Sequence, residues 1–413
     1  MRRVVITGLG TINALGDNVE TCWPRLLAGE NGVGMVEHFD ASDFPVRICA
    51  TARWKPEDHF AAPDFRKLDA FTMLALVSSD EALRDAGIDA GALSESERER
   101  FGCIIGTGIG GIPGIEQQHL GLIEKGPRRV SPHFIPKIMA NAVSGQVAIR
   151  HGILGTTFTT SSACASSGHA IGMALLAVRS GEVDVCLTGG SESATTPLAM
   201  AGFSSAKALS TRNEDPAAAC RPFDLDRDGF VMGEGAGVLV FEELERAKKR
   251  GARIYAEVKG YGSTDDAFHI TAPKEDGSGP ARAFVLALSS GRVDPETIDY
   301  VNAHGTSTKY NDAIETRAIK KCFGDHARKI AISSTKSMVG HLLGGSSAVE
   351  LVATALSIHQ GVVHPTRNLE TPDPECDLDY VPREAREMRV RNALSNSLGF
   401  GGHNVSICVG ALD

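Results

Sequence analysis

Short apolar runs alternate with amphipathic stretches along the whole chain, which is the pattern of a parallel sheet covered by helices. In the first half, the runs that predict strands lie at residues 4–7, 103–106, 183–188 and 238–241. In the second half, they lie at residues 256–259, 300–303, 330–333 and 405–409. Helical periodicity predicts helices over residues 66–86, 313–322 and 345–360. The chain is therefore expected to have an α/β fold.

Each half also contains a strand, then a turn rich in Ser, Thr and Gly, and then a helix of small apolar residues. The first unit is FTTSSACASSGHAIGMALLAV, and the second is AISSTKSMVGHLLGGSSAVELVATAL. Helices that are apolar on most faces are buried, so we expect these two to lie back to back between two sheets. The repeated pattern predicts an internally duplicated fold. A charged connector at residues 242–253 would divide it into halves of residues 1–252 and 253–413.

Charge and cysteine usage narrow the classes of function. The net charge of −9 argues against non-specific binding of nucleic acid. No stretch approaches the roughly 20 apolar residues that a membrane-spanning helix needs. The nine cysteines are isolated, without a CxxC motif, which favours reduced thiols in a cytosolic compartment.

Cys164 lies in TTSSACASSGHA, directly after a predicted strand and at the start of an apolar helix. A helix N-terminus lowers the pKa of a thiol, and its free N–H groups can hold the oxyanion of a thioester under attack. This setting predicts a nucleophile. The alternative is an inert cysteine that acts as a small buried hydrophobic residue.

His304 lies in VNAHGTSTKYND, at the end of a predicted strand. Gly305 lets the backbone turn sharply after it, and the hydroxyl groups of Thr306 and Thr308 could hold an extended polar ligand. A purely structural histidine is the alternative.

Lys336 and His341 share the segment SSTKSMVGHLLGGSSAVE, which ends at Glu350. A lysine among small apolar residues is costly unless it is paired or exposed. Pairing with Glu350, or orientation of a catalytic histidine, would explain it, and a surface lysine on a loop is the alternative. Near the C-terminus, the glycines around Phe400 indicate either a mobile loop that carries this side chain across a pocket or a plain β-turn.

Three sequence features resemble ligand sites without completing them. The segment from Asp224 to Gly229 imitates the start of an EF-hand loop, but the twelfth position is Gly235 rather than Glu. Residues 106–111, GTGIGG, match the G-x-G-x-x-G fingerprint after a strand, but no acidic residue follows at the position of a dinucleotide site. Zinc at Cys164 and the two histidines is conceivable by ligand type, but the spacing is not that of a structural site. We expect neither a metal nor a cofactor.

Taken together, Cys164 in SSACAS, His304 in NAHGTST, the segment STKSMVGH and the terminal GFGGHN resemble the β-ketoacyl-acyl-carrier-protein synthases. The chain is more narrowly similar to the type II elongation enzymes of fatty-acid synthesis. The resemblance covers essentially the whole chain, including ALSTRN, CRPFD and RDGFVMGEGAG. It implies a thiolase fold, with two βαβαβαβ halves in a five-layer αβαβα arrangement, and a homodimer.

The resemblance also implies the reaction. Cys164 would accept an acyl group from acyl carrier protein, with its own backbone N–H group and that of Phe400 as the oxyanion hole. His304 and His341 would then stabilise the enolate formed when malonyl carrier protein loses CO2. Attack of this carbanion on the acyl thioester would yield a 3-ketoacyl chain two carbons longer, in a ping-pong reaction.

Further residues take supporting roles by the same resemblance. Lys336 would hold the arrangement of the histidines, supported by Glu350. The other implied assignments are Thr306 and Thr308 for the phosphopantetheine arm, Ile109 and Phe203 for the acyl pocket, Phe400 as a gate, and Arg66, Lys67, Arg128 and Arg129 as a basic patch for an acidic carrier protein. A solvated helix face explains those basic residues equally well.

Four alternatives compete with this interpretation. A polyketide ketosynthase has the same residues and differs in partner and product, whereas a non-catalytic dimer partner that shapes the acyl cavity is expected to lack the nucleophile. A degradative thiolase is disfavoured, since Phe400 occupies the loop that would carry a second cysteine. The Cys-His-Asn starter-condensing type is disfavoured by His341. We expect the protein in the cytoplasm, or in an organellar stroma or matrix after removal of a transit peptide.

Overall fold

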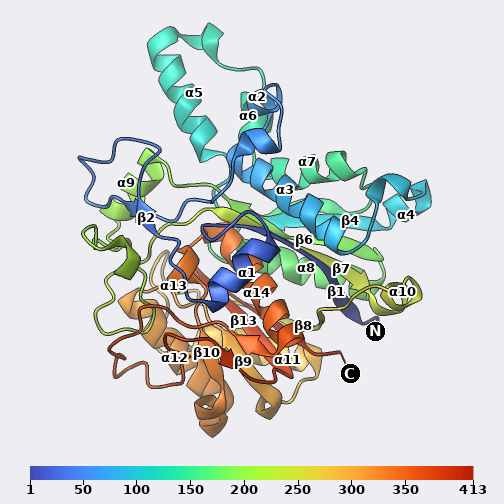
Figure 1. Ribbon diagram of the computed structural model, residues 1–413, viewed down its shortest axis with the longest axis vertical. Coiled ribbons are helices and arrows are strands. Elements are labelled where there is room, and N and C mark those ends of the chain that lie inside the picture. The colour runs from blue at the N-terminus through green and yellow to red at the C-terminus, as the bar shows by residue number, and fades with distance from the viewer. Residues whose placement is uncertain (413) are drawn as a thin grey trace.

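The computed structural model describes residues 1–412, and a ten-stranded sheet runs through it in the order β10-β9-β13-β14-β8-β1-β7-β6-β4-β5 (Figure 1). Each half of the chain supplies five neighbouring strands. Those of the first half are β1 (Val4–Ile12), β4 (Phe101–Gly106), β5 (Thr157–Thr160), β6 (Val185–Glu192) and β7 (Gly235–Glu243). Those of the second half are β8 (Ala256–Asp265), β9 (Ile298–Asn302), β10 (Ala331–Ser333), β13 (Asn392–Gly399) and β14 (His403–Gly410).

The two halves repeat one topology. In the first half, β5, β4 and β6 are parallel, and β7 and β1 follow with antiparallel pairings. In the second half, β10, β9 and β13 are parallel, and β14 and β8 follow in the same way. The predicted duplication is confirmed, but the expectation of a parallel sheet is wrong for β1, β7, β8 and β14. Within the sheet, the halves join through a short pairing of β1 with β8, between Val5 and Glu257 and between Ile6 and Ala256.

Helices form three layers around these strands (Figure 1). α3 (Ala70–Asp85) and α7 (Ala142–His151) cover the outer face of the first half, and α11 (Ser278–Gly291) and α12 (Lys309–Phe323) cover that of the second. α8 (Ser166–Ser180) and α14 (Ser346–Gln360) lie against each other in the middle, where their apolar faces pack on strands from both halves. The predicted αβαβα arrangement and the buried central helices are therefore confirmed.

The helix predicted over residues 66–86 is wrong as a single element. The structure divides it into α2 (Asp64–Lys67) and α3, with an extended backbone at Leu68 and Asp69. The Asp69 side chain accepts a hydrogen bond from the Ala70 N–H group, which begins α3 with an N-cap. The predicted connector is also different, because its first residues belong to β7 and the next form α10 (Leu244–Lys249).

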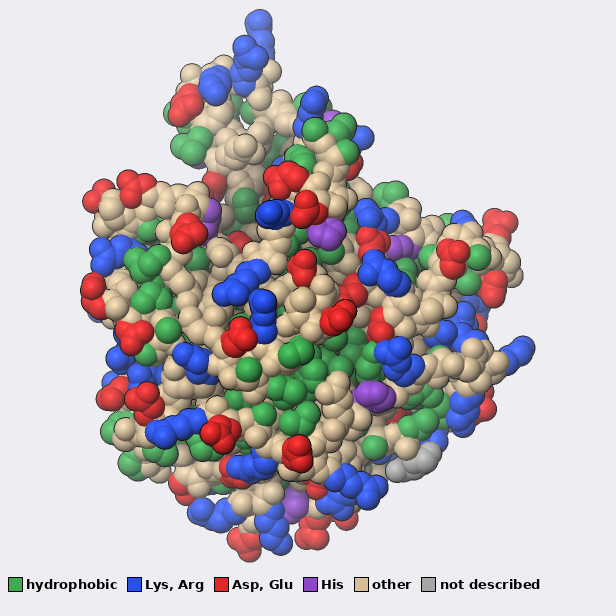
Figure 2. Space-filling view, viewed as in Figure 1, with side chains coloured by type: hydrophobic (Ala, Val, Ile, Leu, Met, Phe, Trp, Pro, Cys, Tyr) green, Lys and Arg blue, Asp and Glu red, His purple; other side chains and the backbone are tan. Residues whose placement is uncertain are grey.

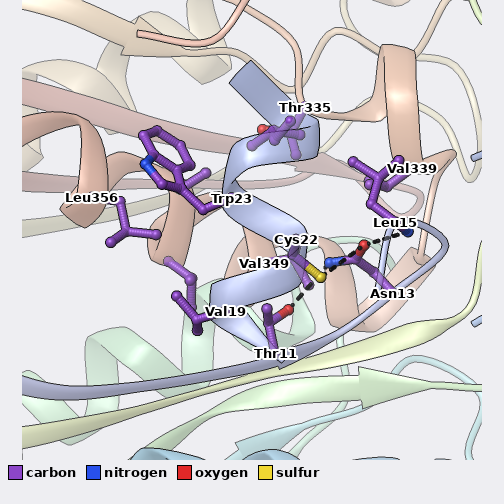
Figure 3. A pocket seen from close by; sticks show the side chains of 13 residues that line it. Thr11, Asn13, Leu15, Val19, Cys22, Trp23, Thr335, Val339, Val349 and Leu356 are labelled. Atoms are coloured by element: carbon purple, nitrogen blue, oxygen red, sulfur yellow. Dashed lines mark hydrogen bonds between the residues drawn. The ribbon is translucent and has the colours of Figure 1, made fainter. Parts of the chain in front are cut away.

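Helix α1 (Val19–Leu27), from the first half of the chain, packs on α14 from the second (Figure 3). Trp23 and Leu26 face α14, and the Trp23 indole N–H group donates to the Gln360 side chain at 2.8 Å. Thr335, in the segment that leads into the candidate site, lines the same pocket as Trp23 and Leu26.

A lobe formed by α5 (Ile112–Lys125) and α6 (Phe134–Ile138) protrudes from the first half (Figure 1). Lys and Arg side chains gather at its outer end (Figure 2). The remaining short elements are β2 (Gly34–Met35), β3 (Ile48–Cys49), α4 (Glu95–Glu99), α9 (Pro197–Ser205), α13 (Lys336–Val339), β11 (Val362–Val363) and β12 (Arg386–Glu387), with single 3-10 turns between them. No helix in residues 1–412 is both long enough and apolar enough to cross a membrane.

Candidate active site

Cys164 lies in the turn that connects β5 to α8, between a strand and a central helix as the sequence indicates. The preceding residue, Ala163, has a φ of 51°, and this left-handed conformation turns the chain sharply into the helix. Ser166 and Ser162 close the turn, since the Ser166 hydroxyl accepts a hydrogen bond from the Ser162 N–H group at 2.8 Å. The thiol is thereby aimed from the helix start toward the second half of the chain.

His304 follows β9, in the loop that leads to α12. The carboxylate of Glu315, on α12, accepts hydrogen bonds from the N–H groups of His304 and Gly305 at 2.8 and 2.9 Å. His341 follows α13, after a glycine with a φ of 71°. Its backbone is fixed by a hydrogen bond from its N–H group to the Val231 carbonyl at 2.7 Å.

The fold brings these separate segments into one cluster, in which the histidines and the lysine are buried and Cys164 is half-buried. The Cys164 Sγ lies 3.1 Å from the His341 Nε2, and the rings of His304 and His341 are edge to face with centroids 5.3 Å apart. The Lys336 Nζ lies 3.2 Å from the His304 Nδ1 and is also paired with the Glu350 carboxylate. The lysine is therefore buried and paired, and the surface-lysine alternative is wrong.

The hydrogen-bond partners determine which ring nitrogens carry protons. An ammonium group can only donate, so the contact with Lys336 leaves the His304 Nδ1 as acceptor and the proton on Nε2. The Nδ1 of His341 lies 2.9 Å from the Ser346 hydroxyl, which can either donate or accept. His341 can therefore exchange the roles of its two nitrogens without losing a partner.

Burial and the lysine charge keep both histidines neutral. Burial, and then the Lys336 ammonium, hold the pKa of His304 and that of His341 well below the ordinary value. Burial raises the pKa of Glu350, although the same ammonium opposes the shift. At neutral pH both imidazoles can therefore donate a hydrogen bond without carrying charge.

The thiol behaves differently from the sequence-based expectation. Burial raises the pKa of Cys164 to about 11, although the Lys336 charge and the Phe400 N–H group lower it, and the negative charge of Glu192 adds to the rise. The expectation that the helix N-terminus lowers this pKa is therefore wrong in its net direction, because desolvation is the larger effect. The thiol is protonated at neutral pH, and the His341 Nε2 is within reach to accept its proton.

A cavity of about 300 Å³ opens onto this cluster. Among the residues predicted for the site, those that line it are Cys164, Phe203, His304, Thr306, Thr308, His341 and Phe400. The hydroxyl oxygens of Thr306 and Thr308 lie 2.9 Å apart. Both stand on the path toward Tyr310, whose side chain is 76% exposed at the mouth. Such a partly polar cavity fits an extended substrate arm.

Phe400 lies in the turn between β13 and β14, where Gly401 and Gly402 have φ values of 89° and 83°. Its ring is 6.5 Å from that of Phe203, and its N–H group faces the Cys164 sulfur. That N–H group and the one of Cys164 are thus both directed at the Cys164 sulfur. Ile109, in contrast, does not line the cavity and is 37% exposed in the single chain.

The four predicted basic residues are all exposed and lie in or beside the protruding lobe. Arg66 and Lys67 belong to α2, which contacts α6, and Arg128 and Arg129 form a 3-10 turn at the end of α5.

Sequence reasoning missed Glu315 and Ser346, which hold the backbone of His304 and the ring of His341. Burial raises the pKa of Glu315 to about 7, against the hydrogen bonds from Gly305 and His304 that lower it. An acidic residue on the apolar face of a helix, one turn after Asp312, was the available signal. Within residues 1–412, no cluster of three or more His, Cys, Asp or Glu side chains is arranged to hold a metal ion.

Comparisons with known proteins agree with this geometry. Residues 1–247 match the model of the β-ketoacyl synthase N-terminal domain, and residues 255–370 match that of the C-terminal domain. The chain is 50% identical to 3-oxoacyl-acyl-carrier-protein synthase 2 of Synechocystis sp., covering 98% of this chain and 97% of the relative. It is 47% identical to the protein of the same name from Staphylococcus aureus, with the same coverage.

Two solved structures extend the comparison. A β-ketoacyl synthase from Burkholderia phymatum is 37% identical, with a TM-score of 0.91 over all of both chains. A type II polyketide acyl-carrier protein in complex with its ketosynthase contains a chain 36% identical, with a TM-score of 0.92 over the full length of each.

Proposed function

The chain belongs to the β-ketoacyl synthase family, and we propose that Cys164, His304 and His341 divide the chemistry of its condensation between them. The enzyme is an acyltransferase that joins malonyl-acyl carrier protein to a second acyl group in fatty-acid chain elongation. The contact of 3.1 Å between the Cys164 Sγ and the His341 Nε2, beside the Lys336–His304 pair, carries the assignment of roles.

In the first step, the Cys164 sulfur attacks the thioester carbonyl of an acyl carrier protein. The proton of the thiol passes to the His341 Nε2 as the carbon–sulfur bond forms, because the free thiol holds its proton at neutral pH. The negative oxygen that develops accepts hydrogen bonds from the N–H groups of Cys164 and Phe400. When the carbonyl reforms, the bond to the phosphopantetheine sulfur breaks, and that sulfur leaves with the proton.

In the second step, malonyl carrier protein enters the same cavity. The Nε2–H groups of His304 and His341 donate to its thioester oxygen as the bond to the carboxylate breaks and CO2 leaves. The resulting carbanion attacks the acyl thioester on Cys164. The carbon–sulfur bond of Cys164 breaks, the thiolate takes up a proton from solvent water, and the product is a 3-ketoacyl chain on carrier protein.

Neutral donors suit this step better than charged ones. An imidazolium would protonate the carbanion that must attack the acyl group, whereas a neutral imidazole stabilises the enolate oxygen and holds its proton firmly. Lys336 supports this state by keeping the His304 proton on Nε2 and by lowering the pKa of both histidines. The donors needed for the enolate are therefore supplied by this chain, and we propose that the reaction uses no cofactor beyond the phosphopantetheine of the carrier.

The passage past Thr306 and Thr308 is the proposed site of the phosphopantetheine arm, since paired hydroxyls can donate to its amide groups. Phe203 and Ile109 are proposed to border the acyl chain, and Phe400 to move between the empty and the acylated states. Arg66, Lys67, Arg128 and Arg129 lie on the lobe as the proposed dock for an acidic carrier protein.

A second copy of the chain is proposed to pack on the free edge of β5. This edge strand ends the sheet, and Phe158 on it, with Met173 and Leu176 on α8, leaves apolar side chains exposed. Edge strands with such neighbours are stabilised when another strand pairs with them.

We further propose that the chain consists of two halves, residues 1–252 and residues 253–413. The relatives named above are bacterial, and all nine cysteines are unpaired, which supports a reducing cytoplasmic setting.

Polyketide synthesis is the second candidate, since ketosynthases of that class share the fold at 36% identity. The higher identity to fatty-acid enzymes, 50%, favours elongation. A non-catalytic partner is disfavoured, because Cys164 and both histidines are present and in contact.

The test is incubation with malonyl carrier protein and acyl carrier proteins of graded chain length, with product masses measured. The expected products are 3-ketoacyl carriers two carbons longer than the acyl substrate, and Cys164→Ala should form none. Undiminished condensation by that variant would contradict the proposed role of Cys164.

A further inference from the structure

The glycine-rich loop after β4, GTGIGG at residues 106–111, surrounds an acidic side chain. Such loops in other proteins present successive N–H groups to a phosphate. Here Glu192, the last residue of β6, fills that position and is fully buried. Its carboxylate accepts hydrogen bonds from the Gly108 N–H group at 2.7 Å, from the Thr107 hydroxyl at 2.9 Å, and from the N–H groups of Ile109 and Gly110, each at 3.2 Å.

A second loop is held by the same carboxylate. The Gly344 N–H group donates to Glu192 at 3.0 Å, and Gly344 lies in the turn that follows His341. A side chain at Gly108 or Gly344 would bring its Cβ to 2.8 Å from the Glu192 Oε2, so both positions must be glycine for the carboxylate to reach its donors. One side chain therefore ties together two loops from different halves of the chain.

Both loops adjoin the reacting sulfur. The carbonyl of Gly108 accepts a hydrogen bond from the Ser161 hydroxyl in the turn that carries Cys164, and the other loop carries His341. The charge of Glu192 raises the pKa of the Cys164 thiol, whereas the charge of Lys336 and the Phe400 N–H group lower it. The His341 ring is in contact with the Cys164 sulfur. The donors to Glu192 are neutral, and burial raises its pKa despite them.

We propose that Glu192 is a positioning residue of the condensing site, whose carboxylate sets the alignment of His341 with Cys164 and the place of Ile109. The inference rests on the proposed roles of Cys164 and His341. Hydrogen bonds from several donors converge on two oxygen atoms, so the carboxylate can be satisfied only when both loops are in place. A shift of about 1 Å between reacting groups can cost roughly 100-fold in rate, so loss of this anchor should be visible in condensation.

Two substitutions distinguish the effect of the Glu192 charge from the effect of its side-chain length. Glu192→Gln removes the charge and turns an NH2 group toward N–H donors, whereas Glu192→Asp keeps the charge but is one methylene too short to hold both loops. Glu242→Gln is the matched control. Glu242 is also fully buried and accepts hydrogen bonds, but it stands at the far end of the same half, paired with Arg246 and Arg250.

Three measurements are made on each purified variant: condensation rate, the chain lengths that acylate Cys164, and the pH dependence of Cys164 alkylation by iodoacetamide. Glu192→Gln should condense at least about tenfold more slowly, accept a broader range of chains, and show an alkylation midpoint at lower pH. Glu192→Asp should share the first two effects with a midpoint close to that of the parent enzyme. Glu242→Gln should lower the melting temperature and leave all three measurements unchanged.

The proposal is overturned if both Glu192 variants condense and select chains like the parent enzyme, or if Glu242→Gln slows condensation equally. If Glu192→Gln does not fold, Glu192→Asp decides alone. Failure of the proposed function is a separate result, since the parent enzyme itself would then not become acylated on Cys164.

Discussion

Removing the Lys336 charge should destabilise the protein by an amount that depends on pH. The ammonium group is 1% exposed and is paired with a Glu350 carboxylate that is equally buried. Lys336→Met keeps the length of the side chain and deletes its charge, so a buried carboxylate is left without a counter-ion. Breaking such a pair by removing one partner typically costs about 3–5 kcal/mol.

The part of this loss of stability that arises from the unpaired Glu350 charge cannot exceed the free energy needed to protonate Glu350. Glu350 can escape the penalty by binding a proton, which at pH 7 costs about 3.4 kcal/mol, or 1.36 kcal/mol for each of the roughly 2.5 units above its ordinary pKa of 4.5. The free energy of unfolding of Lys336→Met should therefore fall by about 3 to 4 kcal/mol at pH 7.

The direction of the pH dependence follows from the raised pKa of Glu350 in the folded variant. A carboxyl group whose pKa is higher in the folded state binds more protons there. The free energy of unfolding of the variant is therefore highest below pH 4.5, where the carboxyl group is protonated in both states, and it declines as pH rises. The loss relative to the parent enzyme should shrink toward pH 4.5 and grow with pH by about 1.36 kcal/mol per unit until Glu350 ionises in the folded state.

Urea unfolding at several pH values measures these differences. The double variant Lys336→Met/Glu350→Leu should regain most of the stability, because no unpaired charge remains, and Lys320→Met, at an exposed pair with Asp377, should cost less than about 1 kcal/mol. Both variants that lack Lys336 should lose decarboxylation of malonyl carrier protein, since the His304 Nδ1 has no donor. A pH-independent loss below about 1 kcal/mol, or a double variant no more stable than the single one, would refute the reasoning.

Three further predictions concern the chemistry and the docking surface. His341→Ala should abolish malonyl decarboxylation and also slow the acylation of Cys164, because His341 serves both proposed steps, and undiminished decarboxylation would contradict the proposed roles. The rate of Cys164 alkylation by iodoacetamide should rise with pH up to about 11, because burial raises its pKa, and a midpoint near 7 would show instead that the helix terminus dominates. Arg128→Glu/Arg129→Glu should raise the KM for acyl carrier protein roughly tenfold at low salt, with kcat and the unfolding free energy unchanged.

The order of strands and helices could be predicted from the hydrophobic pattern, but the direction of several strands could not. β7 and β14 are buried on both faces, as parallel strands in α/β proteins are, and therefore carry no alternation of polar and apolar residues. What distinguishes them is their hydrogen-bonding partner. For β14 the partner is β13, reached through the tight turn at Phe400, and that turn was the one local signal for an antiparallel pair.

Cys164 and His304, two of the residues proposed to act on the substrate, could be found from the sequence because each lies in a turn after a predicted strand. The groups that hold them could not. Glu315 and Ser346 act on His304 and His341 through contacts set by the packing of α12 and α14, and Glu192 meets Gly344 across both halves of the chain. A buried carboxylate whose donors are mainly backbone N–H groups leaves no charged partner in the sequence to suggest its role.

The pKa of Cys164 shows why local reasoning also gave the wrong sign for a single group. A helix terminus acts within one turn, whereas desolvation depends on everything packed around the sulfur, including Leu343 from the other half. The outcome has a chemical consequence. A thiol with a raised pKa beside an imidazole with a lowered one keeps its proton, so the resting pair is neutral. In the proposed mechanism the nucleophile therefore forms only when a thioester carbonyl stands at the oxyanion donors. The same neutral His341 would then donate to the malonyl oxygen in the second step, which an imidazolium locked in an ion pair with Cys164 could not do without protonating the carbanion.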